Sequence, residues 1–263
     1  MPLILSASFD GPYEEINRPA KNKRNIDYDR MFKFAADNCF GLHPMVYSNN
    51  IESWPKNFEW FQEMMQKYDM PQEALYLLHV RNEEWTQKQI HALQDFIRFL
   101  WAKADQYVNH NKDELFKFIL SNGWNILSNS LVRINRGITC SIQSNLMIRT
   151  GDLKLFPCHR TSYPELELGQ FVINENDDLE FHSENVELLI TIFSMHRRNF
   201  NQCLYCPINH LCTGQCLGAC YEATTNLIAP IPTVCAVAHA LAATSVEMLY
   251  KYGLYNEFYK DAS

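Results

Sequence analysis

The sequence predicts an α/β protein in two parts, a β/α part over residues 1–130 and a cysteine-rich α+β part over residues 131–263. In the first part, short apolar runs alternate with amphipathic segments of helix length, a pattern typical of βαβ units with a parallel sheet. Eight of the nine cysteines follow in the second part, which also contains a β-hairpin pattern. We place the boundary near residue 130, where the composition changes.

Three apolar runs in the first part predict strands. Residues 3–9 end at the turn Asp10-Gly11-Pro12, and residues 43–47 end at a polar Ser-Asn-Asn turn. Residues 74–80 are almost continuously apolar, as strands buried on both faces tend to be.

Helices are predicted between these strands from apolar residues at helical spacing. Residues 28–36 form the first, and residues 54–68 form the second. A third helix opens at Thr86 and carries one apolar face, made by Ile90, Leu93, Phe96, Ile97 and Leu100.

The second part has a different pattern. Residues 144–157 predict a β-hairpin around the turn Thr150-Gly151-Asp152. Residues 186–197 predict a helix, and residues 234–250 predict a closing helix rich in alanine and leucine.

Charge and hydropathy indicate where the protein works. The net charge is −7 and the pI is near 5.7, which argues against a nucleic-acid or anionic-membrane partner. No apolar run approaches the roughly 18 residues of a membrane span, and the N-terminus lacks the features of a signal peptide. We therefore expect a cytoplasmic protein, in which nine cysteines do not form a disulfide framework.

The cysteine spacing predicts a metal centre. Cys203 and Cys206 form a C-x2-C pair, followed by Cys212 after five residues and Cys216 after three more. Zinc sites favour two C-x2-C pairs or paired histidines, whereas this loop has one such pair and one histidine. Iron–sulfur clusters accept four cysteines from separated segments, so the spacing favours iron–sulfur over zinc.

The same residues resemble a known family. The run from Cys203 to Cys216, with Cys235 after a gap, is similar to the SPASM domain of radical SAM enzymes. That motif also has an upstream cysteine, a glycine and a second cysteine, positions filled here by Cys140, Gly151 and Cys158. The gap from Gly151 to Cys158 is longer than is usual in the family.

The resemblance implies two auxiliary iron–sulfur clusters of the [4Fe–4S] type. The outer cluster would be held by Cys203, Cys206, Cys212 and Cys235, and the inner one by Cys140, Cys158 and Cys216. The inner cluster lacks a fourth cysteine beside Cys140, so it would keep an open iron or use Cys220, Cys39 or His159.

A second resemblance lies at the start of the chain. The segment from Ser6 to Gly11, followed by Arg18, is similar to the fourth barrel strand of radical SAM enzymes, which implies a partial (β/α) barrel over residues 1–130. Ser8, Asp10 and Arg18 would then lie at a SAM or substrate pocket. The residues alone leave a turn cap open for Asp10 and a solvent-exposed loop position for Arg18.

The chain departs from the family in one chemical respect. It has no C-x3-C-x2-C segment, which in radical SAM enzymes holds the cluster that binds and cleaves SAM. The resemblance therefore implies that this chain does not cleave SAM alone, and that SAM binds only with the missing N-terminal half. We expect a truncated reading frame, a partner chain that carries this motif, or a remnant, and we favour the first two.

The resemblance implies radical modification of a peptide or protein substrate. The auxiliary clusters would relay an electron or hold the substrate, and a ferredoxin or flavodoxin would serve as electron donor. Two alternatives stay open: a non-catalytic iron–sulfur module that binds a peptide or a partner enzyme, and a structural zinc protein.

Overall fold

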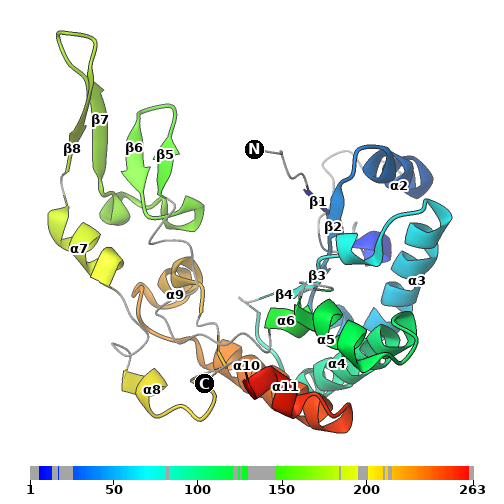
Figure 1. Cartoon of the computed structure of the whole chain (residues 1–263). Helices are drawn as coiled ribbons and strands as arrows, with labels where there is room; N and C mark the ends of the chain where they lie inside the picture. The colour runs from blue at the N-terminus through cyan, green and yellow to red at the C-terminus, as the bar shows by residue number, and fades with distance from the viewer. Residues whose placement is uncertain are drawn as a thin grey trace. The chain divides into compact units, whose positions relative to one another are not determined.

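A computed structural model describes residues 6–13, 17, 26–80, 83–120, 124, 126–129, 146–183, 185–194, 201–209, 211–212 and 215–260 (Figure 1). The chain divides into two compact units. The first comprises residues 1–132 and 236–263, and the second comprises residues 133–235. The C-terminal residues thus belong to the first unit.

The first unit is mixed α/β. Its strands are β1 (Ser6–Ser8), β2 (Gly41–His43), β3 (Met45–Val46) and β4 (Leu78–His79). Its α-helices are α2 (Tyr28–Asp37), α3 (Trp54–Lys67), α4 (Gln87–Tyr107), α5 (Lys112–Leu120), α6 (Ile126–Asn129), α10 (Pro232–Lys251) and α11 (Tyr255–Lys260), with 3-10 turns η1 (Gly11–Tyr13), η2 (Ser48–Ser53) and η3 (Gln72–Ala74).

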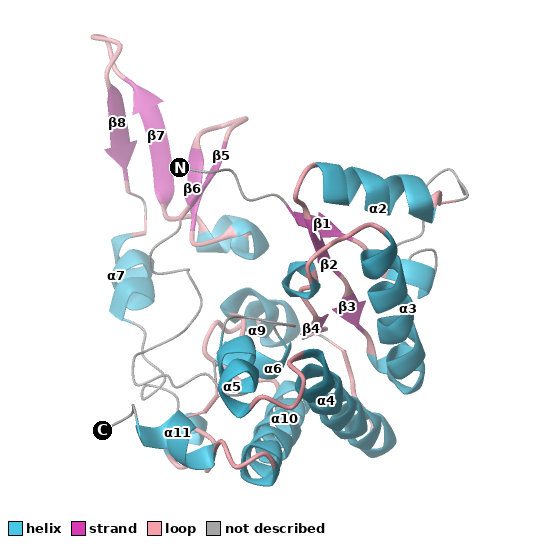
Figure 2. Ribbon diagram, turned by 45° about the vertical axis from the view of Figure 1, so that its right-hand side comes forward, coloured by secondary structure: helices cyan, strands magenta, loops and turns pink. Residues whose placement is uncertain are grey.

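The strands of this unit are parallel and neighbour one another in chain order. β1 pairs with β2, with Ala7 opposite Leu42, and β3 pairs with β4, with Met45 opposite Leu78. A parallel bridge between Leu42 and Leu75 joins the two pairs. Helices α2 and α3 connect these strands and lie on the same side of them (Figure 2). The described residues therefore form successive β/α units, and they do not close into a barrel.

Two of the three predicted strands are interrupted or shorter than expected, and residues 3–5 of the first lie outside the described residues. Pro44 separates β2 from β3, because proline has no amide hydrogen to donate to a neighbouring strand. Residues 74–80 were expected to form one strand, but η3 occupies the start of this run and only Leu78 and His79 pair in β4. An apolar run of this length does not by itself distinguish a strand from irregular extended chain.

The helices agree closely with their predictions. α3 buries Trp54, Phe58, Phe61 and Met65 completely, at helical spacing. α4 begins after Thr86, whose hydroxyl accepts a hydrogen bond from the Gln89 amide in a capping box.

Helix α10 completes the core of the first unit. Its residues Val237, Leu241, Met248 and Leu249 are buried in the same cluster as the apolar faces of α3 and α4. Polar bonds reinforce this packing: Gln94 Nε2 donates to Thr244 Oγ1 at 3.1 Å, and Arg98 Nη2 lies 2.8 Å from Glu247 Oε2.

The length and composition of α10 also meet the criterion for a membrane span, which differs from the expectation from sequence. Its mean hydropathy reaches 1.3 over an 18-residue window, of which 44% is buried inside the structure. Core helices of soluble proteins meet the same criterion, so this helix alone does not assign the chain to a membrane.

The second unit contains a four-stranded antiparallel sheet in the order β5-β6-β7-β8. The strands are β5 (Met147–Arg149), β6 (Lys154–Phe156), β7 (Gly169–Ile173) and β8 (Leu179–His182). The helices are α7 (Val186–Ser194), α8 (Asn201–Leu204) and α9 (Leu217–Thr224), with 3-10 turns η5 (His159–Thr161) and η6 (Pro164–Leu166).

The predicted hairpin is present as β5 and β6. Ile148 lies opposite Leu155, and Arg149 Nε donates to Asp152 Oδ1 across the turn at 2.9 Å. Behind the sheet lies a small core of buried residues: Leu155, Leu166, Leu168, Ile192, Leu217 and Leu227.

Candidate cysteine-rich functional site

Successive turns fold the C-x2-C segment of the second unit into a compact loop. The amide of Cys206 donates to the carbonyl of Cys203 at 3.2 Å, and the amide of Asn209 donates to the carbonyl of Cys206 at 3.0 Å. The amide of Cys212 then donates to the carbonyl of Ile208 at 2.8 Å. Three half-buried thiols therefore lie on one short, hydrogen-bonded segment.

The Gln215 side chain joins this region to the start of α10. Its Nε2 donates to the carbonyl of Ile231 at 2.9 Å and to Cys235 Sγ at 3.0 Å. Its Oε1 accepts from the amide of Ile231 at 2.6 Å and from the thiol of Cys220 at 3.4 Å. One amide group thus holds two thiols that are 15 residues apart in the sequence.

Thiols from the whole segment interact electrostatically. Burial raises the pKa of Cys235, and Cys212, Cys203 and Cys206 raise it further, while the hydrogen bond from Gln215 opposes them. Burial, followed by Cys216, Cys235 and Cys203, raises the pKa of Cys220 to about 12. The thiols of Cys212, Cys203 and Cys206 are thus near enough to Cys235 to influence its pKa.

A second contact links the turn after Cys158 to helix α9. Cys158 precedes η5, where its amide donates to Thr161 Oγ1 at 2.9 Å. In the same turn, Arg160 Nε donates to Glu222 Oε1 of α9 at 3.3 Å.

Gly218 makes this approach possible. A Cβ placed on Gly218 would lie 2.6 Å from Cβ of Arg160, so only glycine permits this spacing. Burial lowers the pKa of Arg160, but Glu222 and the Cys216 thiol outweigh it and raise that pKa overall. Cys216 itself is the residue that precedes the first turn of α9.

The donor set has the chemistry of an iron–sulfur site, because thiolates are the usual ligands of such clusters. Within the described residues, however, no three His, Cys, Asp or Glu side chains converge at metal-ligand spacing. The thiols are gathered in one region of the second unit without being drawn onto a single point.

The remaining candidate residues lie elsewhere or outside the description. Cys140 and Arg18 are outside the described residues. Ser8 is exposed at the end of β1. Asp10 is fully buried and accepts a hydrogen bond from the amide of Met45 at 2.8 Å, so its carboxylate ties the end of β1 to β3.

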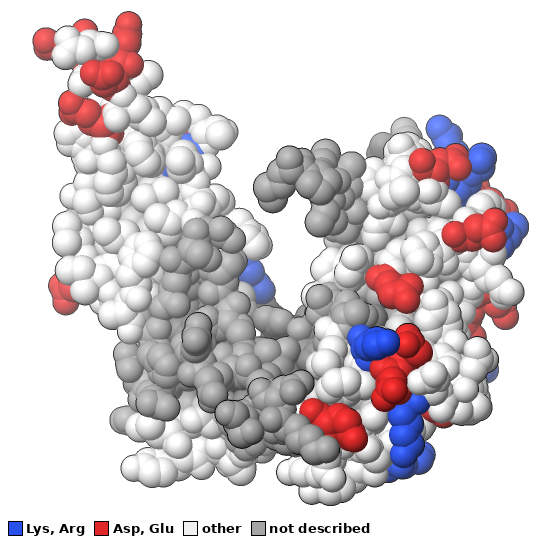
Figure 3. Space-filling view, viewed as in Figure 1, with Lys and Arg blue, Asp and Glu red and all other residues white. Residues whose placement is uncertain are grey.

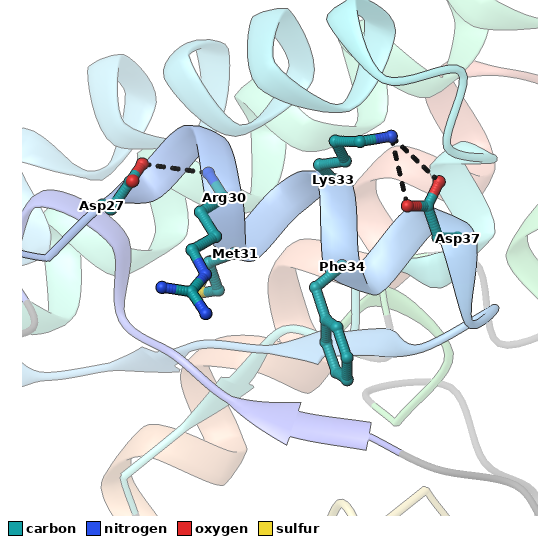
Figure 4. A pocket seen from close by; sticks show the side chains of 6 residues that line it. All are labelled: Asp27, Arg30, Met31, Lys33, Phe34 and Asp37. Atoms are coloured by element: carbon teal, nitrogen blue, oxygen red, sulfur yellow. Dashed lines mark hydrogen bonds and ion pairs between the residues drawn. The ribbon is translucent and has the colours of Figure 1, made fainter.

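A surface hollow of about 620 Å³ lies along α2 (Figure 4). Figure 4 shows Asp27 bonded to the amide of Arg30, and Lys33 paired with Asp37 at 3.2 Å. Asp27 therefore serves as the N-cap of α2. The six described lining residues include no cysteine or histidine, so this hollow is separate from the cysteines of the second unit.

Gln215, Arg160 and Gly218 were not predicted as site residues. Their roles depend on segments that are distant in sequence, and no spacing pattern marks them. The one available signal is position, since Gln215 and Gly218 flank Cys216 within two residues.

Comparison with known proteins adds no assignment: no protein-family model matches the chain, and no curated protein is detectably similar to it.

Proposed function

We propose that this chain is an iron–sulfur protein of the SPASM type, acting as part of a radical SAM system that modifies a peptide or protein. The observation that carries the proposal is the hydrogen-bonded turn segment with Cys203, Cys206 and Cys212, together with the Gln215 amide that bonds both Cys235 and Cys220. Cysteines grouped in this way are typical of metal-binding segments.

The electrostatics support this proposal. Burial, and then the neighbouring cysteines, raise the pKa of Cys235 and of Cys220 in the absence of a cation. A bound metal reverses that balance, because thiolate ligands are stabilised by the positive charge and release their protons on binding. The metal-free protein therefore keeps these thiols protonated, and metal binding would release their protons.

The ligand assignment follows the resemblance. Cys203, Cys206, Cys212 and Cys235 would hold the outer cluster, and Cys140, Cys158 and Cys216 the inner one. When bound, the clusters would supply electron relay or a point of substrate attachment. Gln215 would donate a hydrogen bond to Cys235 sulfur, and hydrogen bonds to ligand sulfur tune cluster potential.

The remaining parts of the proposal concern the first unit and the partners. Consecutive parallel strands joined by helices on one side are compatible with part of a radical SAM barrel. The resemblance alone would assign Ser8, Asp10 and Arg18 to a SAM or substrate pocket. A chain that carries C-x3-C-x2-C would supply SAM cleavage. A ferredoxin or flavodoxin would donate electrons in the cytoplasm.

Anaerobic reconstitution tests the central claim. We expect about eight iron and eight acid-labile sulfide per chain for two [4Fe–4S] clusters, with a brown protein and a broad visible absorption. Stoichiometric zinc without sulfide would establish the structural zinc alternative instead.

A matched pair of variants locates the ligands. Cys206→Ser should remove about half of the bound iron, because it takes one ligand from the outer cluster. Tyr205→Phe is the control, since Tyr205 lies in the same loop, is 91% exposed and carries no thiol. Equal iron loss in both variants would contradict the assignment.

The enzymatic part has a separate test. The reconstituted chain alone should not release 5′-deoxyadenosine from SAM, and addition of a chain with C-x3-C-x2-C should restore this release. Cleavage by this chain alone would contradict the proposed division of labour.

A further inference from the structure

The outermost hairpin of the second unit has an apolar ladder on one face. Phe171 lies opposite Phe181, and Ile173 lies opposite Leu179, so all four side chains share that face. Phe171 packs against the small core, whereas Ile173 is 60% and Leu179 is 59% exposed. The apolar face therefore continues beyond the covered core toward the turn of the hairpin.

The ladder is held in a fixed arrangement. The rings of Phe171 and Phe181 lie 5.1 Å apart, and the Phe181 ring covers Gly169, where a Cβ would approach it to 2.8 Å. The Asn174 side chain closes the turn, because its Oδ1 accepts from the amides of Asn176 at 2.9 Å and Asp178 at 3.0 Å. A ligand would meet a surface that needs little rearrangement.

The edge of this hairpin is open. In the described residues, β8 is the last strand of the sheet and pairs only with β7, and all four of its residues are exposed. Unpaired edges of this kind accept a further strand, and proteins usually protect them with lysine or proline. β8 contains neither residue, and its acidic side chain, Glu180, lies opposite Val172 on the face away from the ladder.

The surroundings are strongly acidic. Residues 161–196 contain eight aspartate or glutamate residues and no lysine or arginine. Four of the acidic residues lie at the tip of the hairpin, where Figure 3 shows a cluster of red side chains: Glu175, Asp177, Asp178 and Glu180. This charge attracts a basic ligand and repels an acidic one.

We propose that the β8 edge binds a short, basic peptide in extended conformation, with apolar side chains at alternate positions and lysine or arginine at the end near the β7–β8 turn. The site is small, because it consists of β8 and the two ladder residues of β7, Phe171 and Ile173. Such a surface suits a short peptide, since stable contacts between folded proteins need about 800 Å² on each partner. The peptide adds a strand by backbone hydrogen bonds, while alternate side chains rest on Leu179 and Phe181. Calling this peptide the substrate rests on the proposed function, but the binding itself needs no iron.

The test uses the full chain without iron and two blocked, fluorescein-labelled peptides of ten residues. Both peptides carry valine at alternate positions, and they differ only in having two lysines or two glutamates at one end. Fluorescence anisotropy should detect binding of the lysine peptide, weakened by added salt, with the glutamate peptide at least roughly fivefold weaker. Equal binding of the two peptides would overturn the proposal.

Charge variants locate the site. Neutralising the tip with Glu175→Gln, Asp177→Asn and Asp178→Asn should weaken the lysine peptide roughly fivefold. The matched control is Glu63→Gln, Asp69→Asn and Asp113→Asn, three exposed residues of the first unit, which should leave binding unchanged. Equal effects of the two triple variants would place binding elsewhere and overturn the proposal.

The strand-addition geometry has its own test. N-methylation of the lysine peptide at alternate residues should abolish binding in one register and leave it nearly intact in the other, because only one set of amides faces β8. The substitution Leu179→Thr, which keeps β propensity, should weaken binding about tenfold by removing apolar contact. Insensitivity to both changes, or dimerisation of the chain that excludes the peptide, would overturn the proposal.

Discussion

Gly218 shows how the absence of a side chain shapes the thiol region. The N-terminal turn of α9 lies against Arg160 because no Cβ stands between them. This approach brings Cys216 beside the turn that follows Cys158, and Arg160 then bonds Glu222 on the same helix.

Gly218→Ala should therefore destabilise the second unit by about 1–3 kcal/mol, because an added methyl group in a tight contact forces backbone shifts. Urea unfolding monitored by far-UV circular dichroism would measure this loss. Gly151→Ala is the control, since a Cβ there meets no atom within 4 Å. If the two variants lose the same stability, the contact with Arg160 is not the constraint described above.

Cys220 gives the iron-free protein a dependence on alkaline pH. Burial and three neighbouring cysteines raise its pKa from 9.0 to about 12, so the folded state holds the thiol proton more tightly than the unfolded state. The associated stability is complete below pH 9.0 and declines as the pH rises toward 12. Unfolding free energies at about pH 8 and about pH 10 should differ more in the native protein than in Cys220→Ala. Equal pH dependence in both proteins would contradict this role of Cys220.

Among the elements, the helices were the most predictable from sequence. The apolar spacing of Trp54, Phe58 and Phe61 defines α3 because every one of these residues meets the core. The strands were less predictable, since two or three residues carry too little pattern, and partners distant in sequence decide where pairing stops. Pro44 and the 3-10 turn before Leu75 are both local interruptions of longer apolar runs.

A single residue, Thr86, caps the N-terminus of helix α4. Thr86→Ala should lower the stability of the first unit by about 1 kcal/mol, because the amide of Gln89 loses its side-chain acceptor. Thr86→Ser should restore most of this loss, since serine keeps the accepting oxygen. Chemical denaturation of the three proteins would measure the difference, and an equal loss in Thr86→Ser would exclude the capping bond as its cause.

At the scale of the whole molecule, the two units differ in the size of their cores. The first core contains Trp54, Trp101 and Trp124 among many fully buried side chains, whereas the described core of the second unit consists of six residues. Small cores are marginally stable without a metal or a disulfide.

We therefore expect the iron-free second unit to open before the first. In hydrogen exchange monitored by mass spectrometry, amides of residues 146–235 should exchange faster than amides of α3 and α4. Reconstitution should slow exchange in the second unit and leave the first nearly unchanged. Uniform protection before and after reconstitution would contradict this difference.

The region of Cys203–Cys220 and Cys235 was predictable only in part, because some of its contacts join segments that are distant in sequence. Short spacings such as that from Cys203 to Cys206 are visible in sequence because one loop presents both residues. The amide of Gln215 reaches Cys220 and Cys235 only after distant segments have folded together, so its role leaves no local pattern.

Helix α10 starts within one compact unit, at Pro232, and most of its turns belong to the other. Beginning a helix is the costly step, whereas each added residue extends it at little cost. A ligand that clamps Cys235 would thus hold the first turn in register, and turns many residues downstream would fray less. Ligand binding at the Cys235 sulfur would then reduce the mobility of the C-terminal end of α10, some 16 residues away.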